Sequence, residues 1–554
     1  MTDNITPAGN DNPDDSGHVE TGTLEHIDPN TLIVDTNVRT EADLDADFIA
    51  SIKEHGVLVP IVAVRGQDGQ LLVRYGQRRT LAAREAGQQT VPVYIRSASG
   101  GDDTAQLVER VAGQIVENDH RRDLTTVQRA KGIQQMLDAG VSVTKVAKTL
   151  AVNKDTVKAA GTAGKSQAAM EALSTGQLSL TEAAALAEFD DVPGAVDKLI
   201  RASGTPWFDH TVAQLREQQA SAAALREAEK PWQEKGFTIL DRYPGSWDVD
   251  YVELSYLRTA TGEQADETVV TDPAHWAVML GEEDMWIDAE TGDLVEEEAV
   301  DWDTQDNPEA VPAEGLRHAN TVKEATMFVP EYFCLDYAAA GLVLDERFRR
   351  FAGLGLSGEK STDTVDLDGD DQDAKAAREA AEAEAARETE RRERRKVIAL
   401  NKLGEAALQV RRQFVTKLLA RKTPPKGAAI FVAECLARDS ALLTDHQAQD
   451  TAAELLGVEG GQAVAKLVAD LSANGDGRAQ VITLALVLGA LESRTPKDAW
   501  RGSTGYWGRH VGSGEYLRWL TDNGYQLAAV EEVVTKAKSA DEVYDDYLAE
   551  VAQQ

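Results

Sequence analysis

Residues 75–79 of this 554-residue chain combine side chains that suit the binding of a phosphate group: Tyr75, Gly76, Gln77, Arg78 and Arg79. They lie between a predicted strand and a predicted helix, where backbone N–H groups are unpaired and the helix dipole is positive. Glycine lets the backbone approach a ligand, and adjacent arginines offer bidentate donors to phosphate. The segment indicates an anion site, although such arginine pairs more often lie on an ordinary surface.

Two further segments supply what a nucleotide site needs. Glu117 and Asn118 place a carboxylate and an amide side by side, and their oxygens are suited to Mg²⁺ held by phosphate groups. Residues 57–61, which follow Gly56, would form the wall of a base or sugar pocket. Cys334 and Cys435 cannot form a disulfide framework or a four-ligand zinc site, so we expect two buried, reduced thiols.

Residues 144–160 have the spacing of a helix-turn-helix, with one short helix over 144–150, a turn at 151–153 and a second helix from 154. Ala147 supplies the small residue at the helix crossing, Ala151 the small turn residue and Val157 the β-branched residue of the second helix. The pattern alone is equally typical of an ordinary helical hairpin. The side chains expected to face DNA are Lys145, Lys148, Asn153, Lys154, Thr156 and Lys158.

The net negative charge of the chain restricts DNA binding to locally basic segments. The chain has 94 acidic and 57 basic residues and a net charge of −37, which repels nucleic acid and anionic lipid at long range. A DNA contact therefore requires a basic patch. Residues 119–168, with nine Lys or Arg and four Asp, carry a net charge of +5 and provide one.

Two other segments have strongly biased charge. Residues 387–426 hold 13 basic residues and four Glu, and residues 281–315 hold 14 acidic and no basic residues. The basic segment is either a solvated helix face, a sequence-independent DNA contact, or a partner of the acidic segment. The acidic segment is either a solvated surface or linker, or a mask that competes with DNA for the basic patches.

Composition and periodicity divide the chain into an α+β domain, an all-α helix-turn-helix domain, a small β-containing region and an all-α C-terminal domain. The predicted boundaries are 1–24 for a disordered acidic tail, 25–103 for the α+β domain, 104–230 for the helical domain, 231–350 for the middle region, 357–396 for a charged linker and spacer helix, and 397–554 for the C-terminal domain. Within the first domain we expect a helix up to His55, a hairpin across residues 67–70, and a helix that begins near Arg78.

An ordered set of short motifs runs through residues 26–200. It comprises Asn37 and Arg39, residues 50–56, Pro60 and Ile61, residues 76–79, 82–83 and 86–87, Glu117 and Asn118, residues 121–124, the helix-turn-helix, and residues 176–179. In this order the motifs resemble the ParB family of DNA-partition proteins. The resemblance covers about a third of the chain and leaves everything after about residue 230 outside it.

The resemblance implies a domain that binds CTP with Mg²⁺ and forms a homodimeric clamp on double-stranded DNA, followed by a helix-turn-helix that reads a short centromere-like site. Glu117 is the candidate catalytic residue of a possible CTPase, and it lies with Asn118 at the metal. Gln77 stands where the family usually has Glu, and Val59 where it often has Gln, so we expect nucleotide binding to persist more readily than hydrolysis. The residues placed at the nucleotide are Gly76, Gln77, Arg78, Arg79, Glu117 and Asn118.

Two alternatives stay open on the sequence. One is a transcriptional or replication regulator with the ParB fold that binds DNA without nucleotide, and the other is a ParB-like nuclease. A ParA-like ATPase is the family's usual partner, but the acidic N-terminus lacks the basic, apolar stretch that stimulates it. The chain shows no secretory signal, and its longest apolar run, residues 481–491, is too short to cross a bilayer, so we expect a cytoplasmic protein associated with a plasmid or nucleoid and no membrane contact.

Overall fold

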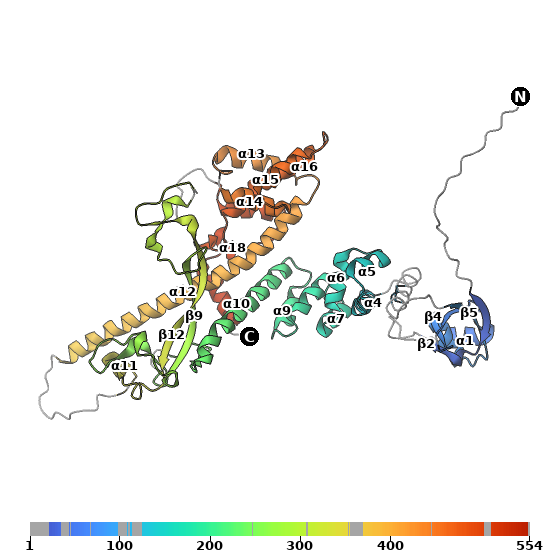
Figure 1. Ribbon diagram of the computed structural model, residues 1–554, viewed down its shortest axis with the longest axis horizontal. Coiled ribbons are helices and arrows are strands. Elements are labelled where there is room, and N and C mark those ends of the chain that lie inside the picture. Colours follow the sequence, from blue (N-terminus) through green and yellow to red (C-terminus); the bar gives the residue numbers. More distant parts are fainter. Residues whose placement is uncertain are drawn as a thin grey trace. The chain divides into compact units, whose positions relative to one another are not determined.

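The computed structural model describes residues 22–551 except 35–43, 45, 67, 98–107, 109–110, 113–124, 246–247, 306–308, 353, 355–368, 445 and 503–510. The chain forms two compact units, residues 1–204 and 205–554 (Figure 1). Among the described residues, no helix is long and apolar enough to cross a membrane.

The first unit begins with a five-stranded mixed sheet in the order β1-β5-β3-β4-β2. Its strands are β1 (Thr23–Ile27), β2 (Leu32–Val34), β3 (Ile61–Arg65), β4 (Leu71–Tyr75) and β5 (Val91–Ser97), with helices α1 (Ala46–His55) and α2 (Gln77–Glu85). Alternate strand residues such as Ile61, Ala63 and Val93 are buried in one core with Ala82 and Ala83 of α2. The period of two along the strands and the small residues of the helix therefore produce a sheet with helices packed on it.

The predicted hairpin and the two helices are confirmed, and the N-terminal boundary is wrong by a few residues. Strand β1 begins at Thr23, inside the predicted disordered tail, and pairs antiparallel with β5. The first four residues of β1 are exposed, so the strand is held by pairing with a segment about 70 residues away and not by an apolar pattern. Such pairing leaves little trace in local sequence.

Further short helices follow the sheet in the first unit. Those with described bounds include α4 (Thr126–Asp138), α5 (Val143–Leu150), α6 (Lys154–Ala163), α7 (Gln167–Ser174), α8 (Leu180–Leu186) and α9 (Ala195–Ala202). Side-chain caps define where several of them begin, including Thr125 and Ser179, which both form capping boxes. The compact unit ends at residue 204, not at 230. Helix α10 (Phe208–Glu234) packs instead on α12 and the sheet of the second unit, because its buried residue Ala213 joins the core of the C-terminal helices.

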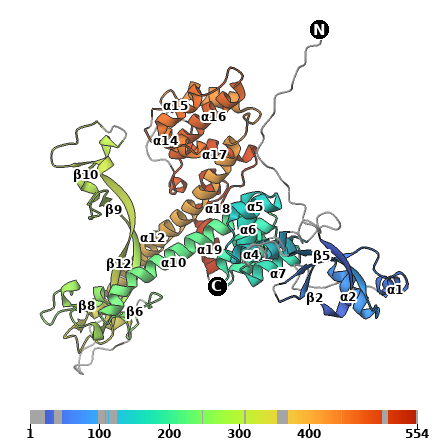
Figure 2. The ribbon, with the colours of Figure 1, turned by 45° about the vertical axis from the view of Figure 1, so that its right-hand side comes forward.

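The second unit is organised around a long two-stranded ribbon, which we define as β9 (Trp276–Asp288) paired antiparallel with β12 (Val322–Cys334). The short strands β6 (Thr238–Ile239) and β7 (Val252–Glu253) extend the ribbon to a four-stranded sheet. Figures 1 and 2 show the ribbon crossing α10 and α12, with a small lobe at each end. One lobe includes β8 (Leu257–Arg258), β13 (Val343–Leu344) and α11 (Glu346–Phe351), and the other, the distal lobe, includes β10 (Val300–Asp301) and β11 (Arg317–His318).

The acidic residues 281–315 are therefore not simply a linker. Their first part, up to Asp288, is strand β9, and their later part folds in the distal lobe around a core that includes Val300 and Trp302. Pairing along all 13 residues of β9 overrides the low strand propensity of its three consecutive acidic residues. The rings of Trp286 and Trp302 lie 4.5 Å apart and connect the ribbon to this lobe.

Helix α12 (Gly369–Leu419) is a single helix of 51 residues, so the predicted boundary between a spacer at 357–396 and a domain from 397 is wrong. Its C-terminal part packs in the helical domain with α13 (Ala428–Arg438), α14 (His446–Leu456), α15 (Gly461–Ala469), α16 (Asp476–Ser493), α17 (Ser513–Asp522), α18 (Ala529–Val534) and α19 (Ala540–Val551). Both cysteines are free and buried, and burial raises the pKa of each thiol to about 11.

Candidate functional site

The predicted anion site lies at the start of α2. Gly76 is the N-cap residue and has a φ of 96°, in the left-handed region that L side chains rarely adopt. A Cβ atom there would also lie 3.0 Å from Nη2 of Arg79. Glycine at this position therefore permits both the tight turn out of β4 and the close approach of the arginine.

Arg79 joins two of the three predicted features. Its Nη1 donates to the carbonyl oxygens of Val59 and Pro60, at 2.5 and 2.8 Å. The helix start and the segment 57–61 are thus held side by side. Leu58 and Val59 are 80% and 55% exposed, so this segment presents an apolar edge beside the helix start, as a wall for a base or sugar would require.

Arg78 lies over the ring of Phe48, with 4.5 Å between Cζ and the ring centroid. Phe48 belongs to α1, so this cation–π contact connects the helix start to a second helix. Phe48 is not among the residues that the sequence predicted for this site. Gln77 is the first residue of α2. Glu117 and Asn118, the predicted Mg²⁺ ligands, lie outside the described residues.

The segment predicted as a helix-turn-helix forms two helices, α5 and α6, joined by residues 151–153. Val146, Ala147 and Val157 are buried between them and their neighbours, in keeping with the roles of the small and β-branched positions. Asn153 is the N-cap of α6, and its Oδ1 accepts a hydrogen bond of 2.6 Å from the backbone N–H of Thr156. This bond accounts for the start of α6 after the turn.

The predicted DNA-facing lysines are displayed to solvent. Lys145, Lys148, Lys154 and Lys158 are all exposed, and Lys158 makes a long pair of 3.8 Å with Asp155 on its own helix. Exposed lysines on two successive helices suit contacts to phosphate groups. The structure thus brings the predicted lysines to one short segment, while Asn153 uses its carboxamide oxygen as a cap.

The turn between α5 and α6 carries a testable strain. Ala151 has φ 53° and ψ 37°, a left-handed conformation that costs a non-glycine residue about 1–2 kcal/mol. We expect Ala151→Gly to raise the free energy of unfolding of this unit by about 1 kcal/mol, since glycine adopts the conformation freely but gains entropy when unfolded. Urea unfolding followed by circular dichroism checks this; a loss of stability would contradict the assignment of Ala151 as a strained turn residue.

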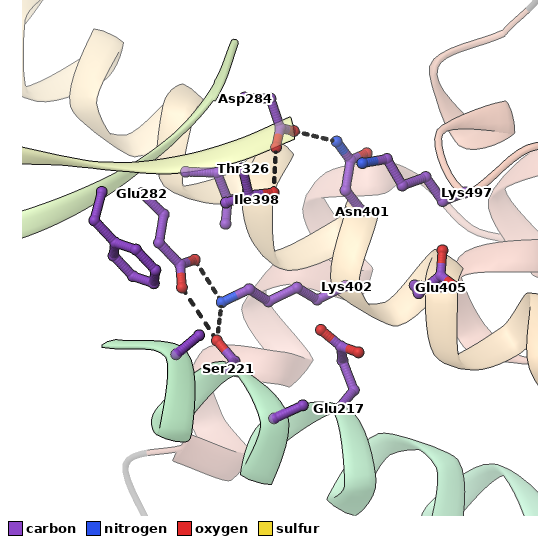
Figure 3. Close-up of a pocket in the computed structure, with 13 residues that line it drawn as sticks. Glu217, Ser221, Glu282, Asp284, Thr326, Ile398, Asn401, Lys402, Glu405 and Lys497 are labelled. Atoms are coloured by element: carbon purple, nitrogen blue, oxygen red, sulfur yellow. Dashed lines mark hydrogen bonds and ion pairs between the residues drawn. The ribbon is translucent and has the colours of Figure 1, made fainter. Parts of the chain in front are cut away.

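A further cluster of charged side chains surrounds a pocket of about 300 Å³ in the second unit (Figure 3). Nζ of Lys402 lies 2.5 Å from a carboxylate oxygen of Glu282 and 2.5 Å from Oγ of Ser221, which donates to Glu282 at 3.1 Å. Beside it, Asn401 donates to Asp284 at 3.0 Å. Helices α10 and α12 and the ribbon therefore meet through polar groups.

Glu217 of α10 is the member of this cluster whose pKa is shifted. Burial raises the pKa of its carboxyl group, the neighbouring Lys402 opposes the shift, and Glu405 and Glu282 add to it. The sequence did not predict this cluster as a unit, because the members named here come from three distant segments, α10, β9 and α12. The only local signals were the biased charges of residues 281–315 and 387–426.

The family of the N-terminal region follows from comparison with known proteins. Residues 11–111 match the ParB N-terminal domain. The match contains the sheet, both helices and the Gly76 turn, and it confirms the resemblance found in the sequence. It covers less than a fifth of the chain and ends before the α5–α6 segment.

Curated ParB proteins are similar over the same part of the chain. A probable chromosome-partitioning protein ParB from Treponema pallidum is 33% identical over 147 residues, which are 26% of this chain and 43% of that protein. A probable plasmid-partitioning protein ParB from Xylella fastidiosa is 38% identical over 123 residues, 22% of this chain and 28% of the relative. The chain thus spans less than half the length of these relatives.

Solved ParB structures align with about a third of the chain. A C-terminally truncated ParB from Caulobacter crescentus in complex with CTP-γ-S is 28% identical; the alignment covers 32% of this chain and 99% of that one, with a TM-score of 0.16. The same protein complexed to its centromeric parS site is 21% identical and covers 32% of this chain and 92% of that one, with a TM-score of 0.24.

Proposed function

We propose that this protein is a ParB-like, sequence-specific DNA-binding protein that partitions a plasmid or phage genome and uses CTP to switch a homodimeric clamp on DNA. The observation that carries the proposal is that the residues matching the ParB N-terminal domain include the left-handed Gly76 turn and two arginines at a helix start. Curated relatives with the same match are named as chromosome- or plasmid-partitioning proteins.

In this proposal the start of α2 binds the triphosphate. Backbone N–H groups at the helix start and the guanidinium of Arg78 supply donors to the phosphate oxygens. Arg79 acts mainly by holding the Val59–Pro60 carbonyls, so that the apolar edge at Leu58 stays beside the nucleotide. Glu117 and Asn118 hold Mg²⁺, which would neutralise phosphate charge, and Gln77 leaves the site weaker in hydrolysis than in binding.

In the same proposal α5 and α6 bind double-stranded DNA. Lys154 and Lys158 on α6 and Lys145 and Lys148 on α5 contact phosphate groups, and Thr156 lies on the recognition helix. We place the protein in the cytoplasm, associated with the DNA that it partitions.

CTP binding separates the proposal from its first alternative. We expect the wild-type chain with Mg²⁺ to bind CTP in preference to ATP in isothermal titration calorimetry. Arg78→Ala should weaken CTP binding about 10- to 100-fold, because a charge-assisted hydrogen bond contributes about 1.5–3 kcal/mol. Arg65→Ala is the matched control, since Arg65 is exposed at the end of β3 and makes only a 4.0 Å pair with Glu25.

The outcomes of this titration are distinct. Equal CTP affinity in Arg78→Ala and wild type contradicts the assigned phosphate contact. No CTP binding by a folded wild-type protein contradicts the nucleotide switch and favours a ParB-fold regulator that binds DNA alone. Thermal melts of both variants show whether loss of the Arg78–Phe48 contact has unfolded the domain.

A further inference from the structure

Helix α12 presents a stripe of basic side chains to the four-stranded sheet that contains the ribbon. Arg391 pairs with Glu253 of β7 at 2.7 Å, and Lys402 pairs with Glu282 of β9 at 2.5 Å. These two residues lie 11 positions apart, so the stripe runs for about 16 Å along the helix. The stripe belongs to the basic segment 387–426, for which the sequence left three interpretations open.

We call the region where α12 and its neighbours meet the sheet the junction. It contains three more polar contacts. Arg394 pairs with Glu283 at 3.4 Å, Asn401 donates to Asp284 at 3.0 Å, and Lys497 pairs with Glu324 at 3.2 Å. In these three contacts the sheet supplies the carboxylate, and the donor comes from α12 or, for Lys497, from the turn after α16. Arg394 also pairs with Glu390 of its own helix, at 2.8 Å. Of the three interpretations of the basic segment, its pairing with acidic residues 282–284 is the one that the structure shows.

The junction is also loosely packed. The pocket of about 300 Å³ borders it, and so does a groove of about 960 Å³ that is lined by Arg387, Arg391, Arg394 and Arg395. The distal lobe and the C-terminal helical domain each have a hydrophobic core of their own. The ribbon could therefore leave α12 without the loss of either core.

The junction contains carboxylates beyond those that its cations pair with. Glu217 and Glu405 face the cluster around Lys402 without a hydrogen bond to it among the described contacts, and Glu331 lies close to Glu253 in the groove. Ion pairs that remain partly exposed contribute little net stability. The pairs formed by Arg391, Arg394 and Lys402 are all partly exposed, with side-chain exposures of 25–63% for the cations and 16–41% for their carboxylate partners.

We propose that this face of α12 is a second DNA-binding surface, and that the ribbon's carboxylates cover it in the place of phosphate groups. Its partner is the backbone of double-stranded DNA, bound without sequence preference, because the stripe offers only arginine and lysine. The exchange replaces one set of anions with another and keeps the cations paired, so DNA can compete with the ribbon. The proposal adds to the sequence-specific binding assigned to α5 and α6 and stands independently of it.

The test compares two triple variants with the same change in net charge. One neutralises the junction, with Glu282→Gln, Glu283→Gln and Asp284→Asn. The control neutralises three exposed residues of the distal lobe, with Glu296→Gln, Glu297→Gln and Glu298→Gln. Fluorescence anisotropy measures binding of a labelled duplex of arbitrary sequence as the salt concentration is varied.

We expect the junction variant to bind this duplex at least tenfold more tightly than wild type at low salt, with a steeper salt dependence, and the control to stay within twofold of wild type. Adding Arg391→Ala, Arg394→Ala and Lys402→Ala should abolish the gain. Equal gains in the two triple variants, or a gain that survives removal of these cations, would overturn the proposal.

Two further arms keep the test decisive. The single change Glu283→Gln alters the most exposed of the pairs, so it should fold and give a smaller gain in the same direction. Both triple variants are also measured with Lys154→Ala and Lys158→Ala. The gain should persist in that background, which separates failure of this proposal from failure of DNA reading by α5 and α6.

Discussion

Arg411→Met is expected to lower the free energy of unfolding of the second unit by about 3–5 kcal/mol, because it leaves two buried carboxylates without their counter-charge. Arg411 is 2% exposed, and Glu492 and Glu531 are 1% and 3% exposed. Its guanidinium binds Glu492 in a bidentate manner at 2.9 and 3.0 Å and Glu531 at 2.7 Å. The buried carboxylates hold the pKa of Arg411 well above its ordinary value despite the cost of burial.

Further hydrogen bonds surround this arginine and its two carboxylates. Tyr516 donates to Glu492 at 2.7 Å, Tyr525 donates to Glu531 at 2.9 Å, and Arg411 donates to the carbonyl of Thr495 at 2.7 Å. The network joins α12, α16, α17 and α18. Substitution of one member therefore affects the attachment of several helices at once.

Arg438→Met is the matched control for this experiment. Arg438 also binds one glutamate through two nitrogen atoms, with Glu515 at 2.8 and 3.1 Å, but the two side chains are 37% and 42% exposed. An exposed pair contributes about 0–1 kcal/mol. All nine tryptophans lie after residue 204, so urea unfolding followed by tryptophan fluorescence reports on the second unit alone. Similar losses of stability in both variants would contradict the claim that burial makes the Arg411 ion pairs more important than the exposed Arg438 pair.

The second large effect concerns DNA. Lys154→Ala combined with Lys158→Ala should weaken binding to the protein's DNA site about tenfold or more and lower the slope of log affinity against log salt by about 2, since each lost phosphate contact removes about 0.9 from the slope. Both lysines are exposed on α6, so the fold should be unaffected. Fragments of the host replicon, screened by gel shift, provide the site.

Lys198→Ala with Arg201→Ala removes the same charge from α9 and serves as the control. We expect this pair to change affinity less than threefold. Binding of the α6 variant that matches wild type in both affinity and salt slope would contradict the assignment of α5 and α6. Binding by wild type that does not depend on salt would contradict phosphate contacts altogether.

Local signals explain which parts of the fold were predictable. Gly69 lies in the hairpin between β3 and β4, and Gly76 precedes α2. Both have a positive φ, which favours glycine, so the residue type alone indicates a turn at each position. The α5–α6 pair was likewise disclosed by three buried positions at fixed spacing. Strand β1 and the long pairing of β9 with β12 depend on partners far along the chain. Local patterns predicted a small β-containing region at 231–350 but neither β1 nor the length of the ribbon.

Helix α12 was predicted as helical, but its role and its boundaries were not. Its N-terminal half lacks an apolar stripe, which indicates a solvated spacer. The stripe that it uses instead is basic, and its complement is the acidic strand β9 about 110 residues earlier. The two charge-biased segments were each recognised, but their juxtaposition required the three-dimensional structure.

The candidate site was predictable to the extent that it is local. Gly76 and Arg79 lie where the strand–helix transition placed them, and the proximity of residues 57–61 was an inference that Arg79 now supports. The contact of Arg78 with Phe48 joins two helices and could not be derived from either one. Glu117 and Asn118 stay a prediction.

The central claim is a clamp on DNA that CTP closes, and retention on topologically closed DNA tests it most directly. Wild-type protein is loaded with CTP and Mg²⁺ on a DNA segment that carries its site and is blocked at both ends, then washed at high salt, and the DNA is afterwards cut. The account predicts retention that requires CTP, is released by cutting, and is lost in Arg78→Ala. Retention that is the same without CTP, or that survives cutting, would contradict it.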